Sequence, residues 1–111
     1  MIEKVILDYL KSELSLPVFL ETPVNPPKRY ILFEKTSGSK QNRLSSATFA
    51  FQSYAESMYQ AALLNEQLKT VIENMIKLSE ISSVYLNSDY NFTDIQTKQY
   101  RYQAVFDIFY Y

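Results

Sequence analysis

Apolar residues recur at helical spacing in two parts of the chain. The first lies at the N-terminus, where residues 2–14 place apolar side chains three or four positions apart with charged residues between them. This pattern predicts an amphipathic helix that ends before Pro17, because proline disrupts a helix interior. The apolar positions are Ile2, Val5, Ile6, Tyr9, Leu10 and Leu14.

The second helical pattern lies in the middle of the chain and runs to about Leu78. We expect its apolar stripe to cover the core, with a supporting Glu73–Lys77 pair on the opposite side. Ser53-x-x-Glu56 has the form of a capping box at its start, and Ser57 is the alternative N-cap. The stripe consists of Ala61, Leu64, Leu68, Val71, Ile72 and Met75.

The segments between and after the helices predict strands. Residues 18–20 are short and apolar, and a stiff loop with three prolines follows them. Tyr30–Phe33 opens the next strand, and residues 43–54 form its partner. We place the hairpin turn between them at Gly38, because glycine adopts positive φ at no steric cost.

Two further strands are expected in the last third of the chain. Residues 81–86 form one strand, residues 87–99 a polar connection, and the alternating residues 102–110 the final strand. Short connections favour antiparallel neighbours. We therefore predict a single α+β domain over residues 1–111. It is a two-layer sandwich of a mostly antiparallel sheet of four to five strands, with two helices packed on one face and a long basic hairpin.

Some of the expected strands are apolar on both faces. Tyr30–Phe33 has no polar face, and the final strand carries Val105, Phe109 and Tyr111 on the side opposite the expected core. Two helices can cover only one face, so the apolar groups on the other face stay exposed or pack against another subunit. Scattered surface aromatics are also ordinary in monomers. We favour an oligomer.

Composition removes several kinds of chemistry. The chain has no cysteine, no histidine and a single glycine. Disulfides, Cys/His zinc sites and glycine-rich phosphate loops are thereby excluded, and no serine lies in a nucleophile motif. Asp89 and Asp94 lack the glycine and the closing glutamate of a calcium loop, so we expect a solvated connection there. We predict no enzyme, no catalytic or metal site and no cofactor.

Charge is balanced overall but clustered locally. Eleven basic and twelve acidic residues give a net charge of −1, which argues against direct nucleic-acid binding. No apolar stretch reaches the roughly 20 residues of a membrane span, and the N-terminus has no signal-peptide pattern, so we expect a cytoplasmic protein without membrane contact. A basic cluster is either a hairpin edge kept unpaired by charge or a finger that meets an acidic partner or DNA phosphate. Its members are Lys28, Arg29, Lys35, Lys40 and Arg43.

The ordered pattern resembles the tail-terminator family of long-tailed bacteriophages and prophages. The resemblance spans nearly the whole chain and lies in the order of the elements and in five short pieces. The chain differs from the family in having less glycine in the hairpin and a tyrosine, Tyr54, where tryptophan is frequent. The pieces are Pro26–Ile31, Asn42–Leu44, Phe51–Ala55, Tyr59–Leu63 and Tyr100–Ala104.

The resemblance implies a structural role without catalysis. Members form a homo-oligomeric ring, commonly a hexamer, which stops growth of the tail tube and presents a surface for head attachment. The implied partners are other copies of the chain, tail-tube proteins and neck proteins. The implied location is the host cytoplasm during assembly and then the tail or neck of the virion. Two alternatives remain open: another neck or minor capsid protein, and a small cytoplasmic protein-binding module that acts as a dimer.

Overall fold

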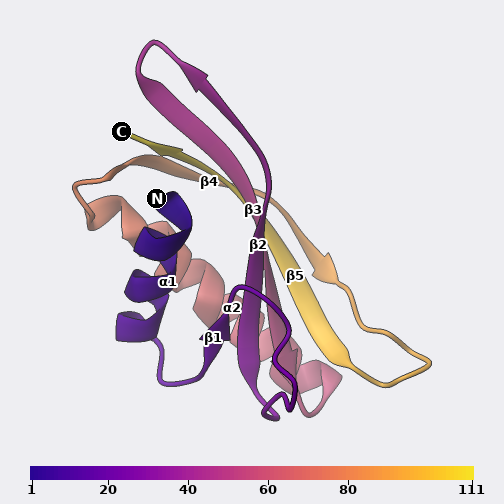
Figure 1. The fold of residues 1–111 in the computed structure, drawn as a ribbon. Helices are drawn as coiled ribbons and strands as arrows, with labels where there is room; N and C mark the ends of the chain where they lie inside the picture. Colours follow the sequence, from indigo (N-terminus) through magenta and orange to yellow (C-terminus); the bar gives the residue numbers. More distant parts are fainter.

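The computed structural model describes residues 1–111 and contains one five-stranded sheet with both helices against one face (Figure 1). The strand order is β1-β2-β3-β5-β4, and every neighbouring pair is antiparallel except β1 with β2. The predicted α+β class is confirmed. The elements are α1 (Ile2–Glu13), β1 (Val18–Phe19), β2 (Tyr30–Gln41), β3 (Leu44–Ala55), α2 (Met58–Glu73), the short 3-10 helix η1 (Asn74–Lys77), β4 (Ile81–Asn91) and β5 (Tyr100–Tyr110).

The core lies between the helices and the three central strands. It is one cluster of 19 buried residues, and its largest fully buried side chains are four phenylalanines, Phe33, Phe49, Phe51 and Phe106. Phe51 meets Phe106 edge to face, with ring centroids 6.0 Å apart, across the β3–β5 pair. Aromatic rings bury large areas, so these four side chains contribute much of the hydrophobic stabilisation of the fold.

The long helix begins at the alternative N-cap. Ser57 has an extended backbone, and its hydroxyl accepts a hydrogen bond from the Gln60 N–H at 3.1 Å. The capping box at Ser53 is wrong, because β3 continues through Ser53 and buries its side chain fully. The helix ends at Glu73, and η1 continues the helical segment to Lys77, one residue short of the expected end near Leu78. The predicted stripe is buried except for Val71, which packs at the margin of the core.

The hairpin turn is not at Gly38. Gly38 lies within β2, opposite Ala47, and has no positive φ. The chain turns instead at Asn42 and Arg43, with φ of 52° and 69°. Two consecutive residues of positive φ are typical of the tight turn that suits the twist of a hairpin, and asparagine tolerates that conformation well.

The polar connection is shorter than predicted, because β4 extends to Asn91. Asp89 therefore belongs to a strand, and its carboxylate accepts hydrogen bonds from Asn65 Nδ2 at 3.0 Å and Lys69 Nζ at 2.6 Å. The expected solvated connection is wrong for Asp89. Asp94 does lie in the loop, where its carboxylate accepts hydrogen bonds from the backbone N–H groups of Gln96 and Thr97.

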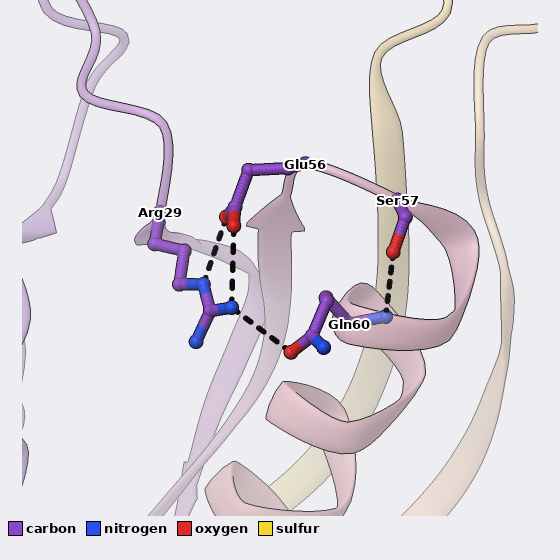
Figure 2. A network of polar contacts seen from close by, with 4 residues as sticks. All are labelled: Arg29, Glu56, Ser57 and Gln60. Atoms are coloured by element: carbon purple, nitrogen blue, oxygen red, sulfur yellow. Dashed lines mark hydrogen bonds and ion pairs between the residues drawn. The ribbon is translucent and has the colours of Figure 1, made fainter.

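A polar network holds the proline loop against the body of the subunit. Arg29 Nε and Nη2 donate to the two carboxylate oxygens of Glu56 at 2.8 and 3.2 Å, and Nη2 also donates to Gln60 Oε1 at 2.9 Å (Figure 2). The hydrogen bond from the Arg29 guanidinium lowers the pKa of Glu56. The start of β2 is thus tied to the junction between β3 and α2.

Truncation of the helix stripe tests the two-layer packing. Leu68 and Ile72 are fully buried, so Leu68→Ala and Ile72→Ala should each lower the free energy of unfolding by about 2–5 kcal/mol, measured by urea denaturation. Leu63→Ala, on the same helix but 47% exposed, is the matched control and should change it by less than about 0.5 kcal/mol. Equal effects at all three positions would contradict the packing.

The Asp89 contacts predict a pH-dependent contribution to stability. The hydrogen bond from Lys69 is the main cause that lowers the pKa of Asp89 in the folded state. The contribution is therefore complete above the unfolded pKa of about 4 and is lost as pH falls through the lower folded pKa. Asp89→Asn should destabilise the protein at pH 7, and its difference from wild type in urea unfolding should shrink towards pH 3. Asp8→Asn, at an exposed helix position, should show little difference at either pH.

Candidate interaction surface

The outer part of the β2–β3 hairpin projects beyond both helices (Figure 1). We define the outer hairpin as residues 35–46. Residues 34–43 are all exposed, although the two strands remain paired as far as Gln41 and Leu44. The molecule is correspondingly elongated, with extents of 45 × 25 × 24 Å. This ordered ribbon contributes little to the core of its own subunit.

The outer hairpin carries three predicted site residues. Lys35, Lys40 and Arg43 are its charged residues, and it contains no acidic side chain. The ion pairs of the chain all lie elsewhere. The three cations are therefore exposed and have no acidic partner within the subunit.

Arg43 occupies a conformation that favours glycine. A left-handed backbone costs a residue with a Cβ about 1–2 kcal/mol, and glycine is the preferred second residue of this type of turn. The turn nevertheless places an arginine there, at the far end of the hairpin. Strained residues are concentrated at functional positions, which supports Arg43 as a site residue.

Gly38 makes room for Lys35. A Cβ at Gly38 would lie 2.9 Å from Lys35 Cε and 3.2 Å from Lys35 Nζ. The β2–β3 register shifts between Lys35 and Ser37. The single glycine thus permits a close side-chain approach, whereas the sequence suggested a turn.

Phe109 lies beside the hairpin on the face of the sheet away from the helices. It pairs with Ser46 of β3 and meets Tyr85 of β4 edge to face, with ring centroids 5.9 Å apart. The two rings border a hollow of about 450 Å³ that the hairpin closes on one side. Val105 lies further along β5 opposite the buried Ala50, and Tyr111 is 75% exposed just past the end of β5. The structure therefore brings Phe109 to the hairpin and leaves Val105 apart.

Much of the remaining face is polar and hydrogen-bonded within the subunit. Gln52 accepts from the Tyr54 hydroxyl and donates to Gln103, in each case at 2.9 Å, and Gln103 donates to the Tyr90 hydroxyl. Thr48 donates to Asp107 at 2.7 Å. This face is not a continuous apolar surface.

The apolar second face of the Tyr30–Phe33 segment is partly covered by the chain itself. The Tyr30 ring stacks on Tyr54, with centroids 4.3 Å apart, and Phe19 packs edge to face against Tyr30 at 5.8 Å. Both tyrosines are buried. Tyr30 therefore needs no second subunit to remove it from water, and the case for association depends on the hairpin and its surroundings.

Two contributors to this surface were missed by the sequence interpretation. Tyr85 is 59% exposed and contacts Phe109, yet nothing in its segment distinguishes it from a core tyrosine. Asn42 begins the turn. The sequence did indicate a turn at this position, because asparagine between two strand segments favours positive φ.

No protein-family model matches the chain, and no curated protein matches it. Neither helix has the length and apolar character that a membrane crossing requires. No group of three acidic side chains lies close enough together to hold a metal ion.

Replacement of Arg43 tests whether its backbone is strained. Arg43→Gly removes the left-handed strain but adds flexibility worth roughly 0.5–1 kcal/mol, so the free energy of unfolding should stay unchanged or rise by up to about 1 kcal/mol. Lys40→Gly, in the adjacent strand, is the control and should lower it by about 0.5–1 kcal/mol. Thermal and urea unfolding measure both. If Arg43→Gly is as costly as Lys40→Gly, the turn is not strained.

Proposed function

We propose that this chain is a structural protein of a phage or prophage, a tail terminator that forms a ring at the head-proximal end of the tail. The ring ends growth of the tail tube and contributes to the surface that joins head and tail. The protein acts through protein contacts, without catalysis or a cofactor. It assembles in the host cytoplasm and remains in the virion.

The outer hairpin is the observation that carries this proposal. Along residues 35–41 β2 has no strand partner except β3, and ordering each backbone residue costs about 1–2 kcal/mol. Yet β2 stays paired with β3 as far as Gln41, and the outer hairpin has three exposed cations and little part in the core. A projecting element of this kind suits a contact with another subunit. A ring requires such a contact between two different surfaces of the same chain.

The resemblance to tail terminators is the second support. The pieces that carry it lie at structurally distinct points. Pro26–Ile31 leads into β2 and contains Arg29, which contacts Glu56. Asn42–Leu44 forms the tip of the hairpin. Tyr100–Ala104 opens β5. The long basic hairpin of the family thus has a counterpart in the outer hairpin.

A dimeric binding module is the alternative from a different class. The exposed Tyr85 and its partner Phe109 favour it, because an aromatic pair on an open sheet face can pack against its own copy. The mass of the protein in solution separates the two functions: a binding module stops at the dimer, because a closed dimer cannot add further subunits, whereas a ring-forming protein gives larger assemblies. A neck or minor capsid protein would also form rings and differs in the position it takes in the virion.

Charge reversal on the hairpin tests the proposed function. Lys40→Glu combined with Arg43→Glu should leave unfolding by circular dichroism nearly unchanged. When the variant is co-expressed with the tail-tube protein of the same genome, electron micrographs should show overlong tubes where wild type gives tails of fixed length. The defect should be stronger at low salt, where charge repulsion is less screened.

The control has the same change in net charge elsewhere on the chain. Lys4→Glu with Lys11→Glu alters two helix lysines, and it should leave tail length normal. Normal tails with the hairpin variant would contradict a role of the hairpin in termination. If wild-type protein leaves tube length uncontrolled, the tail-terminator function itself is wrong.

A further inference from the structure

The sheet has two open edges of different character. β1 pairs only with Ile31 and Leu32, so the outer half of β2 has a strand partner on one side alone. β4 is the terminal strand at the other end of the sheet and pairs only with β5. Open edges present unpaired backbone N–H and C=O groups, which can pair with a strand of another chain.

The β4 edge lacks the residues that commonly block such pairing. Ile81–Asn91 contains no lysine, arginine or proline. Register shifts at Ile81/Ser83 and Leu86/Ser88 bound a short regular stretch, and this stretch includes Tyr85 and Leu86, which are 59% and 45% exposed. The two bulges limit an added strand to this stretch, and its exposed apolar side chains favour strand addition there.

The two edges are complementary in charge. The outer hairpin carries Lys35, Lys40 and Arg43 with no acidic residue. Residues 80–91 carry Glu80 and Asp89 with no basic residue; Asp89 already pairs with Lys69, so Glu80 is the acidic side chain of this edge that has no basic partner in the subunit. Pairing β2 with β2 would bring like charges together, which destabilises cross-strand pairs, and pairing β4 with β4 would leave the cations of the outer hairpin without acidic partners. Pairing β2 with β4 brings opposite charges together.

Strand direction also fits a head-to-tail arrangement. β2 and β5 run one way and β3 and β4 the other, because β2–β3, β3–β5 and β4–β5 are all antiparallel. Rotation about an axis roughly parallel to the strands preserves these directions in the next subunit. The β4 strand of one copy then lies antiparallel to β2 of its neighbour, which is the slightly more stable type of ladder.

We propose that the partner of the β4 edge is a second copy of this chain, whose outer β2 strand pairs with it antiparallel and continues the sheet from subunit to subunit. This contact uses two different surfaces, so it leaves one free edge of each kind at the ends of any open chain. Repeated around an axis it closes a ring when the rotation from subunit to subunit divides a full turn evenly. The proposed contact rests on the proposed function in one respect: the ring that it builds would be the tail-terminator ring.

Single cysteines test the contact cleanly, because the native chain has none. Ser39→Cys lies on the outer β2 strand and Asn87→Cys on β4, and both residues are exposed. A mixture of the two variants, treated with a short bismaleimide at high protein concentration, should give covalent dimers that denaturing electrophoresis detects. Each variant alone should give few covalent dimers, because the contact pairs the β2 edge of one copy with the β4 edge of another.

A cysteine at Lys11→Cys, exposed on α1, provides the matched control. Its mixture with Ser39→Cys sets the background for random encounters. The expected result is a heterotypic yield at least several-fold above that background, and no excess above it overturns the proposal. Efficient crosslinking of Asn87→Cys with itself would identify a β4–β4 dimer and would also overturn it.

The edge contact and the tail-terminator function can fail separately. Heterotypic crosslinks without control of tail length support the contact and contradict the function. Tails of fixed length without heterotypic crosslinks support the function and contradict the contact. Tyr85→Lys adds an independent check, because a lysine on the β4 edge should reduce the heterotypic yield several-fold while circular dichroism stays unchanged.

Discussion

Coverage of the sheet by only two helices is the constraint on which the rest of this structure depends. α1 and α2 bury one face, where Phe33, Phe49, Phe51 and Phe106 form the centre of the core. The β2–β3 ribbon continues beyond that layer, and its outer residues are small, polar or cationic because no helix shields them. The same sheet thus has a buried part, which packs against the helices, and a solvent-exposed part, the outer hairpin. The first stabilises the subunit, and the second is available for contacts outside it.

The periodic parts of the fold could be predicted from the sequence, because burial on one face leaves a regular pattern. Both helices, β5 and the α+β class follow from that pattern. The turn could not be placed, since Gly38 lies within β2 without a positive φ and the positive φ values fall on Asn42 and Arg43. The end of β4 was missed because its residues are polar, and pairing with β5 makes it a strand.

Only the charged part of the candidate surface could be predicted from the sequence. Charged residues are exposed almost wherever they occur, so Lys35, Lys40 and Arg43 could be named from composition and spacing. Exposure of an aromatic residue depends instead on partners distant in the chain. Tyr30 is covered by Tyr54, whereas Tyr85 remains open beside Phe109. No local pattern distinguishes these two tyrosines, because cross-strand register decides which ring is covered.

Weak edges suit a protein that must stay dispersed until it assembles. Under the proposed pairing, one contact consists of a short backbone ladder and exposed charge pairs, each pair worth only about 0.2–1 kcal/mol. Two subunits would then separate readily. In a closed ring every subunit has two such contacts, and the second forms at a high effective concentration because the first already holds the neighbour in place. A tail end that gathers several subunits would raise that concentration further. Under the proposed function, ring closure at the tail then needs no strong pairwise affinity, and the polar, cationic hairpin is compatible with both the free and the assembled subunit.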